Sequence, residues 1–267
     1  MRLVAVTCAS THIYEEQLIP FIGSLRDLGG YNDKIYVIDY GLKRGEVKKL
    51  RENHVDVIPA LKHYNPIISD RFKTLYEYFK DSKDVYVAEW DSDVWFAQNI
   101  TDLEQYYKPS TLVATLDATY QHFLDGCVNI EHKPYVKTVL KKVTEMNDGF
   151  VLQGGFIAGD SKALGLFSGI QDMVIESEIG RDTFGVDMVA MNMFQYYQPD
   201  NVEVISIAYN CLPDWNLYRE NGKFFADYKE TEVKAIHVSG PNRALKKYDF
   251  KNFYPDLYQD WLKRLAV

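Results

Sequence analysis

Residues 85–93 read VYVAEWDSD, so that an apolar run ends in two aspartates separated by a single serine. A short apolar run of this kind is typical of a fully buried strand. Three earlier runs are similar, at residues 3–6, 35–38 and 55–58. The segments between the runs place apolar residues at helical spacing. This alternation predicts an α/β fold with a mostly parallel central sheet and helices on both faces. Such sheets bind ligands at the carboxyl ends of their strands, where Asp91 and Asp93 stand.

The second half of the chain continues the pattern less regularly. Strands are predicted at residues 112–116, 204–207 and 233–238. Helices are predicted from about Ser161, over residues 186–197 and over residues 253–265. No linker rich in Pro, Gly or Ser interrupts the chain, so we expect one domain over residues 1–267 that ends in a helix at about residues 251–267.

The composition is that of a globular protein. The chain has 267 residues, 46% apolar and 25% charged, which is enough for a sizeable buried core. Its 30 basic and 38 acidic residues leave a net charge of −8, which disfavours broad contact with nucleic acid. The longest stretch without a charged side chain, residues 188–199, is too short to cross a bilayer, and we expect no secretory signal. Three cysteines without C-x-x-C spacing indicate reduced thiols, so we expect a cytoplasmic protein.

Asp91 and Asp93 are the first candidates for chemistry. Two carboxylates at i and i+2 beyond a strand can face one ligand, and together they suit a hard divalent cation. The alternative is a solvated turn at the strand end, in which aspartate caps the backbone. His237 lies near the end of the apolar run 233–238, where a lone histidine is more often a core or surface residue than a ligand. With two carboxylates, its imidazole would complete a site that favours Mn²⁺ or Mg²⁺ over zinc.

His237 also opens the sequence HVSGPNR, residues 237–243. The glycine in this segment, Gly240, allows a ligand to approach the backbone closely. Arg243 can present its planar guanidinium to a phosphate. The segment therefore has the parts of an anion-binding turn directly after the candidate metal ligand.

Two other segments could carry function. The paired glycines Gly154 and Gly155 stand before a predicted strand, where the alternatives to a functional role are a β-bulge or tight packing. Asp187 and Asn192 lie near one face of the predicted helix at residues 186–197. Its dipole would also favour an aspartate in the first turn without any catalytic role.

The order of these motifs resembles that of retaining glycosyltransferases of the GT-A fold, most of all the group that contains glycogenin and the bacterial lipooligosaccharide galactosyltransferases. The resemblance runs over roughly residues 3–247. The matching segments are Thr7-Cys8-Ala9-Ser10, Asp91-Ser92-Asp93, Gln153-Gly154-Gly155-Phe156, residues 187–192, residues 212–216 and residues 237–243. It implies a nucleotide-binding half at about residues 1–105 and an acceptor-side half at about residues 106–250.

The resemblance also implies roles for single residues. Asp91, Asp93 and His237 would ligate Mn²⁺, or Mg²⁺, that bridges the diphosphate of a nucleotide-sugar. Asp187 and Gln153 would act at the reacting sugar. Further donor contacts are implied for Thr7, Cys8, Ala9, Lys73, Ser92, Gly154, Gly240 and Arg243.

The chain departs from the family pattern at several of these positions. Arg71 competes with Lys73 for the place of the family's basic donor contact. Met188 stands where the family has a glutamine beside the reacting sugar. Gln153 replaces an asparagine, and Arg243 replaces a lysine.

The implied activity is metal-dependent transfer of a sugar from a nucleoside-diphosphate sugar, for which we expect a UDP-sugar, to the hydroxyl of a carbohydrate or other acceptor, with retention. Two alternatives stay open. One is a phosphohydrolase of the haloacid dehalogenase type, with Asp91 as nucleophile and Asp93 as general acid. That family normally opens the chain with this motif. The other is a non-catalytic module that binds a nucleotide-sugar without turnover.

Overall fold

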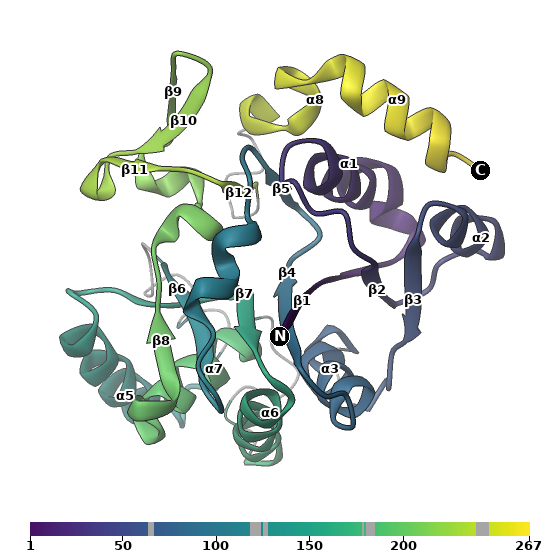
Figure 1. Ribbon diagram of the computed structural model, residues 1–267. Helices are drawn as coiled ribbons and strands as arrows, with labels where there is room; N and C mark the ends of the chain where they lie inside the picture. Colours follow the sequence, from purple (N-terminus) through teal and green to yellow (C-terminus); the bar gives the residue numbers. More distant parts are fainter. Residues whose placement is uncertain (64–66, 118–123, 125–127, 178, 180–184, 239–245) are drawn as a thin grey trace. The chain divides into compact units, whose positions relative to one another are not determined.

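The chain packs as two compact units. The computed structural model describes residues 1–63, 67–117, 124, 128–177, 179, 185–238 and 246–267, and its elements are labelled in Figure 1. Unit 1 comprises Met1–Arg2, Ala60–Val87 and Tyr106–Ile205. Unit 2 comprises Leu3–Pro59, Ala88–Gln105 and Ser206–Val267.

The helices and strands divide between the units as follows. Unit 2 holds, from Leu3 on, β1 (Arg2–Ala9), a π-helix (Tyr14–Leu18), α1 (Ile19–Asp27), β2 (Ile35–Asp39), α2 (Arg44–Glu52), β3 (Val55–Pro59), β5 (Val94–Phe96), β9 (Tyr218–Glu220), β10 (Lys223–Ala226), β11 (Thr231–Glu232), β12 (Ala235–His237), α8 (Phe250–Phe253) and α9 (Pro255–Leu265). Unit 1 holds α3 (Arg71–Phe79), β6 (Leu112–Asp117), α5 (Lys133–Met146), β7 (Val151–Gly159), α6 (Ser161–Glu176), α7 (Val186–Tyr197) and β8 (Val202–Val204). β4 (Val85–Trp90) begins in unit 1 and ends in unit 2.

A seven-stranded sheet is the centre of the fold, with the strand order β3-β2-β1-β4-β7-β6-β8 in the described residues. The pairs β1–β2, β2–β3 and β6–β8 are parallel, whereas β6 and β7 are antiparallel. The predicted α/β fold with a mostly parallel central sheet is therefore confirmed. Every residue of β6 and β7 is buried, and successive side chains of a strand point to opposite faces. Both faces of these strands are consequently covered.

In unit 2, three parallel strands end at the same edge. Ala9 of β1 is level with Asp39 of β2, which in turn is level with Pro59 of β3. The predicted helix at residues 253–265 is interrupted at Tyr254, because Pro255 begins the new helix α9. α9 lies beside α1 (Figure 1).

In unit 1, the predicted helices begin where expected. Asp160 caps α6 by accepting a hydrogen bond from the backbone N–H of Ala163 at 2.8 Å. α7 has the predicted bounds. The paired glycines, however, lie inside β7 and do not precede it. The register between β6 and β7 shifts at this stretch, where a β-bulge or another irregularity interrupts the pairing.

Several elements differ from the prediction because they depend on tertiary pairing. The strand predicted at residues 204–207 ends at Val204, since the Ser206 side chain accepts the backbone N–H of Ala208 and begins a 3-10 helix. Short strands with weak periodicity, β5 and β9 to β11, were not predicted, and neither was α5. Among the described residues, no helix is both long and apolar enough to cross a bilayer.

Candidate functional site

Two short antiparallel strands bring His237 to the aspartate pair. β5 follows Asp93 directly, and His237 of β12 is level with Val94 of β5. The backbone N–H of Val238 donates to the carbonyl oxygen of Asp93 at 3.0 Å, and that of His237 donates to Cys211 at 2.9 Å. The pairing therefore fixes the imidazole beside the end of β4, although the two segments are far apart in the sequence. All these residues belong to unit 2.

The three side chains converge on one point. His237 Nε2 lies 3.2 Å from Asp93 Oδ1 and 3.6 Å from Asp91 Oδ2. One ligand atom from each residue lies within 4.8 Å of the others. The imidazole is 2% exposed, while the carboxylates of Asp91 and Asp93 are 27% and 17% exposed. Solvent therefore reaches the cluster from the carboxylate side.

The spacing suits a divalent cation. Neighbouring ligands around an octahedral Mg²⁺ ion lie about 3 Å apart, since each metal–oxygen distance is about 2.1 Å. The two distances from His237 Nε2 are close to this value. Two carboxylates held this close also repel each other, and a cation between them would relieve the repulsion. The donor set of two oxygens and one nitrogen fits Mn²⁺ or Mg²⁺.

The segment that lies beside β12, around Cys211, is buried. Burial raises the pKa of the Cys211 thiol to about 12. Within the described part of the chain, neither Cys8 nor Cys211 forms a disulfide. The Trp90 indole N–H donates to the carbonyl oxygen of Tyr209 at 2.9 Å, which anchors the end of β4 just before the aspartates.

A second group of predicted residues meets in unit 1, around Asp187. Asp187 lies in the first turn of α7, and its Oδ2 accepts a hydrogen bond from Arg71 Nη2 at 2.7 Å. The same nitrogen donates to the carbonyl oxygen of Gly154 at 2.6 Å. A methyl group on Gly154 would lie 2.8 Å from the Met188 side chain, so only glycine lets β7 approach α7 this closely. Arg71 thus joins the aspartate of α7 to the bulge in β7.

Gln153 and Asn192 stabilise the same junction. Gln153 is 6% exposed, and its side-chain oxygen accepts the backbone N–H of Gly155. The Asn192 side chain is fully buried and bonds both the N–H and the carbonyl of Leu152, at 2.8 and 3.0 Å. It also donates to the carbonyl of Met188 at 2.8 Å. The hydrogen bonds of the Asn192 amide therefore hold α7 against β7.

Lys73 does not join this group. Its ammonium pairs with Asp172 of α6 at 3.0 Å, in a contact that is about one quarter exposed on both sides. Arg71 is the basic residue of α3 that contacts Asp187 and Gly154. The sequence does not decide between Arg71 and Lys73, because both lie at the start of the same short helix. Arg71 is the first residue of α3, and Lys73 is two residues later.

The remaining predicted positions lie elsewhere. Thr7, Cys8 and Ala9 form the last part of β1, and at most 4% of each is exposed. Thr7 Oγ1 is buried without a hydrogen-bond partner among the described residues. Ser92 is 7% exposed and contacts Gln17. Gly240 and Arg243 fall outside the described residues, so the predicted phosphate contacts there stay predictions.

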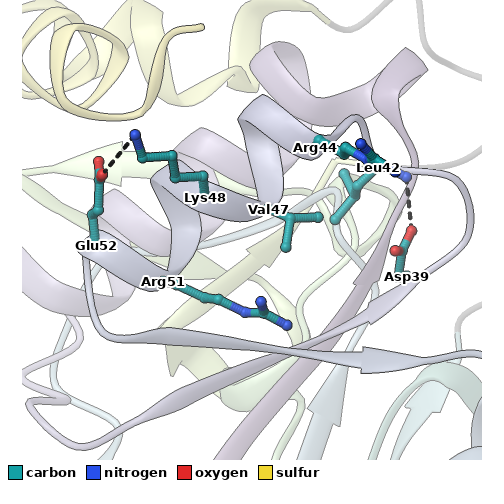
Figure 2. A pocket seen from close by; sticks show the side chains of 7 residues that line it. All are labelled: Asp39, Leu42, Arg44, Val47, Lys48, Arg51 and Glu52. Atoms are coloured by element: carbon teal, nitrogen blue, oxygen red, sulfur yellow. Dashed lines mark hydrogen bonds and ion pairs between the residues drawn. The ribbon is translucent and has the colours of Figure 1, made fainter.

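Unit 2 also has an open hollow of about 590 Å³ along α2, shown in Figure 2. It is lined by Asp39, Leu42, Arg44, Val47, Lys48, Arg51 and Glu52. Asp39 Oδ1 accepts the backbone N–H of Leu42 at 2.7 Å, and Lys48 pairs with Glu52 at 3.8 Å. The lining carries both signs of charge, so it does not select one kind of ion. It shares no residue with the Asp91–Asp93–His237 cluster.

Comparison with known proteins identifies the fold. No protein-family model and no curated protein matches the sequence. The galactosyltransferase LgtC, solved with donor and acceptor sugar analogues, has a TM-score of 0.64 at 15% identity, over 96% of this chain and 95% of LgtC. The bifunctional glycosyltransferase WbbM has a TM-score of 0.63 at 15% identity, over 99% of this chain and 49% of WbbM. Mouse xyloside xylosyltransferase 1 has a TM-score of 0.53 at 13% identity, over 91% of this chain and 98% of that enzyme. The chain has the GT-A fold of these glycosyltransferases.

Proposed function

We propose that this protein is a metal-dependent glycosyltransferase that moves a sugar from a nucleoside-diphosphate sugar, in the first place a UDP-sugar, to an acceptor hydroxyl. One observation carries the proposal: Asp91, Asp93 and His237 form a cluster that could hold a cation, at the end of a strand in a GT-A fold. The three fold relatives named above are glycosyltransferases, which favours this reaction over the phosphohydrolase alternative.

Asp91, Asp93 and His237 would hold Mn²⁺ or Mg²⁺. When bound, such an ion acts as a Lewis acid that neutralises the charge of the departing diphosphate. The protein holds these side chains in place before the donor binds. His237 is buried and held by backbone hydrogen bonds on both sides, so its imidazole loses little freedom when a ligand arrives.

We assign Asp187 and Gln153 to the reacting sugar, on the resemblance to the retaining family. Asp187 suits the role of orienting donor hydroxyls, because its carboxylate is 22% exposed while Arg71 fixes one of its oxygens. Gln153 stands in β7 directly before Gly154, and its side-chain oxygen accepts the backbone N–H of Gly155. Arg243 and Gly240 would complete the diphosphate contacts.

The proposed stereochemical outcome is retention. In that case the acceptor hydroxyl attacks from the side of the leaving group, and an oxygen of the departing phosphate takes its proton. No dedicated carboxylate base is then required. Proton NMR of the first product formed from an α-linked donor tests this point: an α-linked product is expected, and a β-linked product contradicts retention.

A panel of nucleotide-sugars with Mn²⁺ tests the activity itself. We expect one donor to raise the melting temperature and to be turned over, slowly to water and faster with a sugar acceptor. Asp93→Asn should lower turnover by at least about 100-fold, because it weakens electrostatic stabilisation at the leaving group. Turnover of an aryl phosphate with Mg²⁺ would instead support the phosphohydrolase. Donor binding without turnover by any acceptor would support the non-catalytic module.

A further inference from the structure

The turn that carries the two aspartates is also contacted by a side chain from another part of unit 2. The backbone N–H of Val94 donates to the carbonyl oxygen of Asp91 at 3.2 Å, which closes a turn at residues 91–94. The first and third side chains of this turn contact His237. The side chain between them, Ser92, contacts Gln17: Ser92 Oγ donates to Gln17 Oε1 at 2.9 Å. Both ends of this contact lie in unit 2.

Through this hydrogen bond, Gln17 holds the middle of the turn. A serine hydroxyl can rotate, so its direction depends on the acceptor that it finds. Gln17 offers an uncharged acceptor, which restrains the Ser92 side chain and with it the turn that carries the aspartates on either side. Ser92 is only 7% exposed, so water does not readily replace Gln17 in this role.

Gln17 is itself held in an unusual helix. Tyr14–Leu18 form a π-helix, in which the N–H of Ile19 donates to the carbonyl of Tyr14. Single π-turns are rare and occur frequently at functional sites. The Tyr14 hydroxyl donates to the carbonyl oxygen of Leu265 at 3.0 Å in a buried contact, so the last turn of α9 fixes this helix. The π-helix that carries Gln17 is therefore anchored at its first residue.

We propose that Gln17 is a positioning residue for the cation site, which acts through Ser92 and holds the turn that carries both aspartates. The proposal rests on the proposed function, since it takes Asp91, Asp93 and His237 as the metal ligands. Gln17 lies outside all of the sequence motifs described above. Gln17 is not a catalytic residue, because it need not touch the donor.

A Mn²⁺ titration of the full-length apoprotein tests the proposal without any turnover. The signal of free Mn²⁺ in electron paramagnetic resonance disappears on binding and gives the dissociation constant. We expect Gln17→Ala and Ser92→Ala each to weaken binding about 10- to 100-fold, the usual effect of removing a partner that orients a metal ligand. The double variant should bind no more weakly than the single ones, since all three break the same hydrogen bond. Gln17→Asn, which keeps an amide on a shorter side chain, should bind more tightly than Gln17→Ala.

The controls separate a local effect from a loss of structure. Glu16→Ala changes an exposed neighbour in the same π-helix and should bind Mn²⁺ like the wild type. Unfolding by urea should show that Ser92→Ala is folded. Because Ser92→Ala removes the same hydrogen bond, it tests the proposal even if Gln17→Ala does not fold. Wild-type affinity in both single variants would overturn the proposal, and so would fully additive losses in the double variant.

The failure of this inference can be distinguished from the failure of the proposed function. Asp93→Asn is measured in the same titration. If Asp93→Asn loses Mn²⁺ binding while Gln17→Ala and Ser92→Ala keep it, the metal site stands and the role of Gln17 is wrong. If the wild type binds no Mn²⁺ at all, the proposed metal site is contradicted, and the proposed role of Gln17 is contradicted as well.

Discussion

Arg71 and Asp187 form an ion pair across 2.7 Å in which the guanidinium is only 3% exposed. The same Arg71 nitrogen also donates to the carbonyl oxygen of Gly154. A charge this deeply buried is stable only when acceptors surround it. Arg71 therefore serves two purposes: it orients the carboxylate assigned to the donor sugar, and it joins α7 to β7 within unit 1.

Replacing Arg71 by methionine should damage both stability and activity. Breaking a buried pair costs about 3–5 kcal/mol, and the partial exposure of Asp187 lowers our expectation to about 2 kcal/mol. Transfer should fall at least about tenfold, because Asp187 loses the partner that orients it. Urea unfolding and initial rates measure the two effects. The matched control is Lys73→Met, whose pair with Asp172 is about one quarter exposed on both sides and should contribute no more than about 1 kcal/mol. A larger effect from Lys73 than from Arg71 would contradict this assignment.

Gly154→Ala should destabilise the protein, although it adds only one methyl group. Its methyl group would lie 2.8 Å from Met188 Cγ and 3.5 Å from Asp187 Cγ, so the start of α7 must shift. We expect a loss of about 1–3 kcal/mol in urea unfolding. Gly169→Ala is the control: a methyl group there meets nothing within 4 Å in the middle of α6. It should stabilise the protein by about 0.5–1 kcal/mol, and equal effects at the two sites would refute the packing argument.

Cys211 should resist thiol reagents in the folded protein. Burial raises the pKa of its thiol to about 12, so the neutral form persists at pH 9, where an exposed cysteine is largely thiolate. A variant with Cys8 and Cys127 replaced by alanine isolates the effect. Its remaining thiol should stay unlabelled at pH 9 for hours and react within minutes in urea. Since the folded state keeps a proton that the unfolded chain loses, this group should lower stability as pH rises from about 9 towards 12. Rapid labelling of the folded variant would contradict the burial of Cys211.

Mn²⁺ should raise the melting temperature of the protein and EDTA should reverse the change. At a free ion concentration 100 times the dissociation constant, binding contributes about 2.7 kcal/mol to the folded state. For a chain of this size we expect a shift of several degrees by differential scanning fluorimetry. Asp93→Asn should abolish the shift. Asp260→Asn, an exposed position on α9, should leave it unchanged. An equal shift in the Asp93 variant would mean that the ion binds elsewhere.

Much of the sheet and the helices followed from local pattern, because strand and helix periods are properties of neighbouring residues. The run at residues 85–93 predicted a strand that ends at the aspartates, and β4 ends at Trp90. The bounds of α7 were predicted, since its apolar spacing is regular. Where regular structure is only three residues long, as in β5, the period is too short to detect, and the strand exists because it pairs with β12.

The sequence alone determined which chemical groups are available: two carboxylates after a buried strand, a distant histidine and an aspartate at a helix start. Only the tertiary structure decided which of them meet. The pairing of β5 with β12 placed His237 beside Asp93. α3 placed Arg71 against Asp187 and Lys73 against Asp172, and the turn after β4 placed Ser92 against Gln17. The physical reason is that secondary structure depends on the order of neighbours along the chain, whereas a hydrogen bond or a metal site depends on distances between residues that the chain order leaves open.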